Sequence, residues 1–193
     1  MRRQMTCIAV VALAAGLLLF PTAYGQEKPK TEQYSAVWAV VGGGAGGSSV
    51  SIDIRINKYN TDEDIQKYAE LLKEGGPDAL RRALEKEDVG QVSPTGRVGT
   101  PIAVARKLVQ GDKTTIRAVT ARNLSFVELR YSGRSVDYPY TILQLDVDKD
   151  GKGTGTAIGA AKIRFNKKEN TYEIESLEHG TAYNKLLNVR LWK

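Results

Sequence analysis

Most of the chain shows the alternation of apolar and polar residues that is typical of β-strands with one buried face. In the segment 50–59 four apolar residues alternate with polar ones: Val50, Ile52, Ile54 and Ile56. Similar patterns predict strands over 34–41, 100–109, 114–122, 138–148, 154–165, 170–179 and 184–192. Turn-forming residues separate most of these segments, so we expect consecutive strands to pair antiparallel.

A helical period interrupts this pattern after the second strand. Apolar residues recur every three or four positions over 65–72, as on one face of a helix. Thr61, followed by three acidic residues, predicts the start of that helix. The glycines and proline at 75–77 are expected to end it and to begin a second helix. The result is a helical hairpin over about residues 61–88 that covers an open face of the sheet.

These elements together predict the α+β class. The main feature is an antiparallel, strongly curved sheet or small barrel, with the helical hairpin inserted after the second strand. This order is similar to that of the fatty-acid-binding proteins, in which a helical pair also interrupts an antiparallel barrel. The similarity covers the order of elements and no motif.

Side-chain patterns also predict two strand registers. Pairing Asn166 with Thr171 aligns opposite charges on one face of a hairpin and apolar residues on the other. For the preceding hairpin, the pattern favours Asp148 opposite Gly153. This strand also carries a row of small residues that permits close approach of another element: Gly155, Ala157 and Ala161.

Two arginines are the candidate ligand-binding residues. With Gly111 and Asp112 as the turn residues between neighbouring strands, Arg106 lies directly opposite Arg117. Like charges in that position are unfavourable, so either the register slips or an anion lies between the two side chains. A slipped register is the preferred expectation.

Three alternate aspartates form the candidate metal site. Asp146, Asp148 and Asp150, followed by Gly151, resemble the opening of the calcium loop of the EF-hand family. The resemblance implies calcium as the ligand, because calcium prefers several carboxylate oxygens. Ala157 stands where that family has its bidentate glutamate, and strands replace the flanking helices. The alternative, a polar hairpin turn without metal, is therefore favoured.

Residues 1–25 have the features of a secretory signal peptide. Arg2 and Arg3 precede an apolar run over 8–20, and small residues follow at 23–25. The run is shorter than the roughly 20 residues that a membrane span needs. We therefore expect export to the periplasm or the extracellular space, with no stable membrane span after cleavage.

The remaining chain is expected to comprise a flexible leader, 26–33, and a single globular domain, 34–193. Removal of the signal peptide would take away Cys7 and two arginines, and lower the formal net charge from +6 to +4. Basic residues are scattered instead of forming one face, which argues against nucleic-acid binding. His179 is the only histidine, so a multi-histidine metal site is excluded and enzymatic function is not favoured.

Two functions fit this sequence. The first is an exported, non-enzymatic binding protein whose curved sheet and helical cover enclose a small apolar or amphipathic molecule. The second is a structural or adhesive module of the cell envelope, with calcium stiffening the hairpin at 146–151. No cofactor other than this calcium is indicated.

Overall fold

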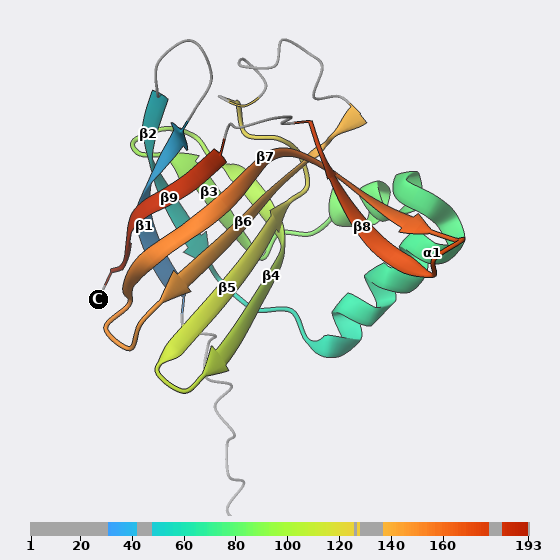
Figure 1. The fold of residues 1–193 in the computed structure, drawn as a ribbon, viewed down its shortest axis with the longest axis horizontal. Helices are drawn as coiled ribbons and strands as arrows, with labels where there is room; N and C mark the ends of the chain where they lie inside the picture. Colours follow the sequence, from blue (N-terminus) through green and yellow to red (C-terminus); the bar gives the residue numbers. More distant parts are fainter. Residues whose placement is uncertain (1–30, 42–47, 126, 128–136, 178–182, 193) are drawn as a thin grey trace, which may run out of the picture.

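The computed structural model describes residues 31–41, 48–125, 127, 137–177 and 183–192. They form nine strands and one helix (Figure 1). The elements are β1 (Glu32–Val41), β2 (Ser48–Ile56), α1 (Asp62–Leu84), β3 (Gly90–Pro94), β4 (Thr100–Gln110), β5 (Lys113–Thr120), β6 (Tyr140–Val147), β7 (Lys152–Asn166), β8 (Thr171–Ser176) and β9 (Tyr183–Leu191). Among these residues no helix is both long enough and apolar enough to cross a membrane.

Eight of the strands close into an antiparallel barrel, which confirms the predicted α+β class and the barrel alternative. From β1 to β7 each strand pairs with the next one in the chain. This includes β2 and β3, although α1 lies between them in the sequence. The last strand, β9, pairs with both β1 and β7, and the pairing of β6 with β7 completes the closure. Full closure leaves these strands without exposed backbone edges.

The ninth strand, β8, lies outside the barrel. The 15-residue β7 uses its first part to pair with β6 and β9, and its last part, from Ala161, to pair with β8. Asn166 pairs with Thr171 and Arg164 with Glu173, so the predicted register of this hairpin is confirmed. The hairpin leans away from the barrel toward α1 (Figure 1).

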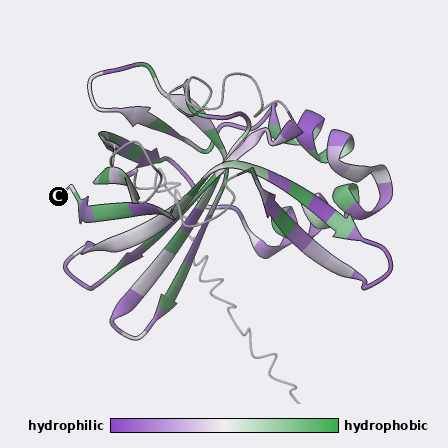
Figure 2. Cartoon of the chain, turned by 45° about the horizontal axis from the view of Figure 1, so that its top comes forward, coloured by the Kyte–Doolittle hydropathy of each residue, from purple (hydrophilic) through white to green (hydrophobic). Residues whose placement is uncertain are grey.

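The barrel interior is filled with apolar side chains. Its largest buried members are Tyr34, Trp38, Ile52, Ile54, Ile56, Ile102, Ile116, Leu124, Leu143 and Leu145. The indole nitrogen of Trp38 donates a hydrogen bond to Asn184 Oδ1 at 2.9 Å, so this buried polar group is satisfied. Hydrophobic and hydrophilic residues alternate along the barrel strands, as the sequence pattern predicts (Figure 2).

The predicted helical hairpin is wrong. The chain forms a single helical element, α1, in which two helical segments meet at a kink at Gly76 (φ 72°, ψ −174°). Only this residue leaves the helical region, and the ring of Pro77 fixes a φ suited to the first turn of the segment that follows, so helical geometry resumes at once. The predicted N-cap is confirmed, since Thr61 and Asp64 form a reciprocal capping box.

Helix α1 packs on the outside of the barrel through a second apolar cluster. Its buried members are Leu72, Leu80, Leu84, Ala103, Ala121, Tyr140 and Ala161. Ala161 belongs to the row of small residues on β7, and it lies in this cluster beside the leucines of α1. At Ala161, therefore, the element that approaches the row of small residues closely is α1.

The predicted register of the β6–β7 hairpin is wrong by one residue. Val147, and not Asp148, pairs with Gly153. The carbonyl of Lys152 accepts a hydrogen bond from the amide of Asp148 at 2.9 Å, and Gly151 takes a positive φ of 75°. The turn is therefore one residue shorter than the polar run suggests, with glycine at the position that needs left-handed geometry.

Some expectations fall on residues that the structure does not describe. The signal peptide, 1–25, and His179 lie outside the described residues. The predicted leader, 26–33, is partly outside them, and its last two residues belong to β1, which begins at Glu32. The strand therefore starts two residues before its apolar pattern does.

Candidate functional site

Arg106 and Arg117 lie side by side on the outer surface of the barrel. They are direct partners in the pairing of β4 with β5, so the expected slip of the register is wrong. Gly111, with a φ of 59°, allows a tight turn that pairs Gln110 with Lys113 and fixes the register. Ala105, Ile116 and Ala118, which are chain neighbours of the two arginines, are buried, and this directs both arginines outward.

The two guanidinium groups differ in their partners. Arg106 Nη2 lies 2.5 Å from Asp62 Oδ1, and the side chain of Asp62, in the first turn of α1, is 84% exposed. Arg117 Nε donates to Gln144 Oε1, a neutral acceptor, at 3.0 Å. Among the described residues Arg117 forms no ion pair. Arg117 therefore has no direct anionic partner among these residues, although Gln144, its acceptor, donates in turn to the carboxylate of Asp146 at 3.1 Å.

Lys107 lies beside this pair and forms an ion pair with a partly buried carboxylate. Its ammonium is 2.6 Å from Glu32 Oε1, while Tyr34 and Tyr59 each donate to Glu32 Oε2 at 2.7 Å. Burial alone would raise the pKa of Glu32, but the hydrogen bonds from Lys107, Tyr59 and Tyr34 outweigh it and lower the pKa below its usual value. Burial, followed by the bond to Glu32, raises the pKa of both tyrosines. Glu32 is thus ionised at neutral pH and compensates Lys107.

A groove of about 300 Å³ runs past these side chains; we call it the arginine groove. It is lined by Ile65, Arg106, Lys107, Leu108, Thr115 and Arg117. Ile65 comes from α1 and supplies apolar surface, and Leu108 supplies more, being 53% exposed. The groove therefore combines a cationic wall with an apolar one, which suits a molecule with an anionic head and an apolar body.

The three candidate calcium ligands have separate roles in the described structure. Asp146 accepts hydrogen bonds from Thr115 Oγ1 at 2.8 Å and from Gln144 Nε2 at 3.1 Å. Asp148 Oδ1 accepts from the backbone amides of Asp150 and Lys152, each at 2.9 Å. Within the described ranges no group of three histidine, cysteine or acidic side chains is arranged to hold a metal ion. Calcium at this turn, and the envelope module that it would stiffen, stay predictions.

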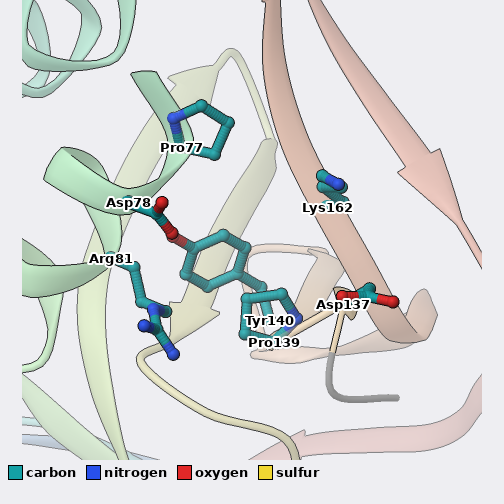
Figure 3. Close-up of a pocket in the computed structure, with 7 residues that line it drawn as sticks. All are labelled: Pro77, Asp78, Arg81, Asp137, Pro139, Tyr140 and Lys162. Atoms are coloured by element: carbon teal, nitrogen blue, oxygen red, sulfur yellow. The ribbon is translucent and has the colours of Figure 1, made fainter. Parts of the chain in front are cut away.

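A second recess was not predicted from the sequence. It lies between α1 and the barrel and is lined by Pro77, Asp78, Arg81, Asp137, Pro139, Tyr140 and Lys162 (Figure 3). These residues come from three segments far apart in the chain. The register predicted for the β7–β8 hairpin places Lys162 opposite Glu175, as in the structure, and no local pattern in the sequence marks the recess.

The chain matches no protein-family model, no curated protein and no solved structure.

Proposed function

We propose that the protein is an exported, non-enzymatic binding protein that holds a small amphipathic anion in the arginine groove. The observation that carries the proposal is the direct pairing of Arg106 with Arg117 while no described acid forms an ion pair with Arg117. Like charges directly opposite on a sheet are unfavourable, and an anion between them removes the repulsion.

The chemistry of the groove suits a carboxylate or phosphate head. Guanidinium groups recognise both through paired, charge-assisted hydrogen bonds. Asp62, the present partner of Arg106, is an exposed side chain and is readily displaced by a ligand. Leu108 and Ile65 offer the apolar surface on which the body of such a ligand would lie.

An outer position is supported by the packing of the barrel. An eight-stranded barrel is just wide enough either to be filled by side chains or to hold one small ligand. Here the described interior positions carry large residues such as Trp38, Tyr34 and Leu145, all buried. The groove outside the barrel is therefore a better candidate than an enclosed cavity.

The composition of the groove supports binding without catalysis. Among the described residues that line it there is no histidine, cysteine or carboxylate to act as an acid, base or nucleophile. Arginine stays protonated at all accessible pH values and so binds anions without transferring protons. Export is supported by the signal-peptide features of residues 1–25.

Calorimetric titration of the processed chain with octanoate, octyl phosphate and octanol tests the proposal. We expect both anions to bind and octanol, which lacks the charge, to bind at least tenfold more weakly. Binding of the anions should weaken as salt is raised, because the contacts are charged and partly exposed. Equal binding of octanol, or no binding of either anion, would contradict the proposal.

Substitutions locate the site. Arg117→Gln and Arg106→Gln should each weaken octanoate binding about tenfold to a hundredfold, since each removes a hydrogen bond to a charged group worth about 1.5–3 kcal/mol. Arg97→Gln is the matched control, because Arg97 is an exposed arginine in the turn between β3 and β4, at the opposite end of β4. Unchanged affinity in both groove variants would place the ligand elsewhere.

A further inference from the structure

The recess between α1 and the barrel contains a buried polar group that has no partner. Tyr140 is 1% exposed, and its hydroxyl makes no hydrogen bond within the described part of the chain. Figure 3 shows its ring crossing the recess, with the hydroxyl directed toward Asp78 on α1. Buried hydroxyl groups in native proteins nearly always have a partner, so this one calls for a bound water or ligand.

The recess is large enough for a small molecule, with a volume of about 370 Å³. Its floor is the aromatic ring of Tyr140, and Pro77 and Pro139 add apolar surface around it. Burial, opposed by the nearby charge of Arg81, raises the pKa of Tyr140 to about 12. The hydroxyl therefore keeps its proton at neutral pH and can both donate and accept a hydrogen bond.

Charged groups of both signs surround this hydroxyl. Asp78 and Arg81 come from α1, while Asp137 and Lys162 lie on the barrel side (Figure 3). These four side chains form no ion pair with one another among the described contacts; Arg81 instead lies 4.0 Å from Glu85. The two acids and two bases are therefore spaced apart around an open volume.

Lys162 forms no ion pair with Glu175, its partner across the sheet, because Arg164 binds that carboxylate. It is paired across the sheet with Glu175, but Arg164 takes both acids of β8, lying 3.5 Å from Glu173 and 3.3 Å from Glu175. No ion pair of Lys162 occurs among the described residues. Its ammonium is consequently available to a ligand in the recess.

We propose that this recess binds a small zwitterion, a molecule with one carboxylate and one ammonium group. Lys162 receives the carboxylate on the barrel side, Asp78 on the facing segment of α1 receives the ammonium, and the hydroxyl of Tyr140, directed toward Asp78, completes its hydrogen bonding with the ligand. A simple anion or cation would leave one of these two charges unmatched, which disfavours its binding. The site is separate from the arginine groove and does not depend on the function proposed for it.

Thermal shift and calorimetry with the processed chain test this proposal. The probes are the twenty free amino acids and L-alanyl-L-alanine, together with N-acetylated and C-amidated L-alanyl-L-alanine. We expect one or more zwitterions to bind and raise the melting temperature, and each blocked end to weaken binding at least tenfold. No binding by any zwitterion, or equal binding of the blocked peptides, would overturn the proposal.

Substitution of Tyr140 separates a binding role from a structural one. Tyr140→Phe removes a hydroxyl that has no partner in the unliganded protein, so the melting temperature of the free protein should stay the same or rise. Zwitterion affinity should fall about twofold to tenfold, the worth of one neutral hydrogen bond. A lower melting temperature with unchanged affinity would assign the hydroxyl a purely structural role.

Lys162→Gln tests the carboxylate subsite and should weaken zwitterion binding about tenfold or more. Lys152→Gln is its matched control, since it changes an exposed lysine at the other end of the same strand, β7. Arg117→Gln, which acts on the arginine groove, should leave zwitterion binding unchanged. Equal losses in Lys162→Gln and Lys152→Gln would show a non-specific effect of charge and would refute the assignment.

Discussion

Replacing Glu32 should destabilise the protein, because its single carboxylate holds several side chains together. It joins three elements at one end of the barrel, because Tyr34 of β1, Tyr59 of the loop before α1 and Lys107 of β4 all bond to it. Glu32→Ala removes every one of these bonds. It also leaves the hydroxyl of Tyr34, a residue that is 2% exposed, without its acceptor.

The expected loss follows from the three contacts. A hydrogen bond to a charged group contributes about 1.5–3 kcal/mol, which gives about 3 kcal/mol or more for Tyr34 and Tyr59 together. The ion pair with Lys107, whose side chain is 32% exposed, adds at most about 1 kcal/mol. We therefore expect Glu32→Ala to lose at least about 3 kcal/mol of unfolding free energy. Glu32→Gln keeps one acceptor oxygen and should lose about half of that.

Urea unfolding at pH 7, followed by circular dichroism, measures these losses, and a series at lower pH gives a second check. Because the pKa of Glu32 is lowered in the folded protein, its contribution is complete above the unfolded value of about 4.3 and is lost as the pH falls through the folded value. Glu32→Gln should lack this part of the acid dependence. A loss below about 1 kcal/mol in Glu32→Ala, or identical acid profiles, would refute the reasoning.

Two further predictions concern the strand that closes the barrel and the turn that leads into it. Gly155→Ala should lower the free energy of unfolding in urea by more than about 3 kcal/mol, because the new Cβ would lie 2.1 Å from the carbonyl oxygen of Gln144. Gly111→Asn should lose far less, because a side chain there meets open space and asparagine tolerates a positive φ. The hydrogen bond from the amide of Lys152 is the main cause that lowers the pKa of Asp148. The stability that this carboxylate contributes should therefore be present above about pH 3.9 and disappear as the pH falls further. Asp148→Asn should remove this acid-dependent part of the stability in the same assay.

Alternation along the strands was sufficient to predict most of the barrel. In β2 the buried residues Ile52, Ile54 and Ile56 alternate with polar ones. The opposite charges of Arg164 and Glu173 predict the register of the β7–β8 hairpin correctly. The pattern is reliable here because a shift of one residue would exchange the buried and exposed faces.

The two strand registers that were predicted wrongly are set by the geometry of a turn and not by which residues face the interior. The β6–β7 register depends on the positive φ of Gly151 and on the bonds that Asp148 makes, and neither is visible in the alternation. The expected slip at Arg106 and Arg117 was wrong for a related reason. The tight turn at Gly111 fixes the pairing of β4 with β5. Asp62 of α1 forms an ion pair with Arg106, and the sequence of the two strands alone does not predict this contact.

Both proposed sites owe their existence to α1 and to its bend. The first turn of the helix brings Asp62 and Ile65 to the arginine groove, and the segment after Gly76 brings Asp78 and Arg81 to the recess over Tyr140. A barrel of eight strands whose interior is filled with side chains leaves no room inside for a ligand, so both sites are proposed on its outer surface. The helix between β2 and β3 builds that surface, because it adds charged side chains to an outer wall without disturbing the closed hydrogen bonding of the strands.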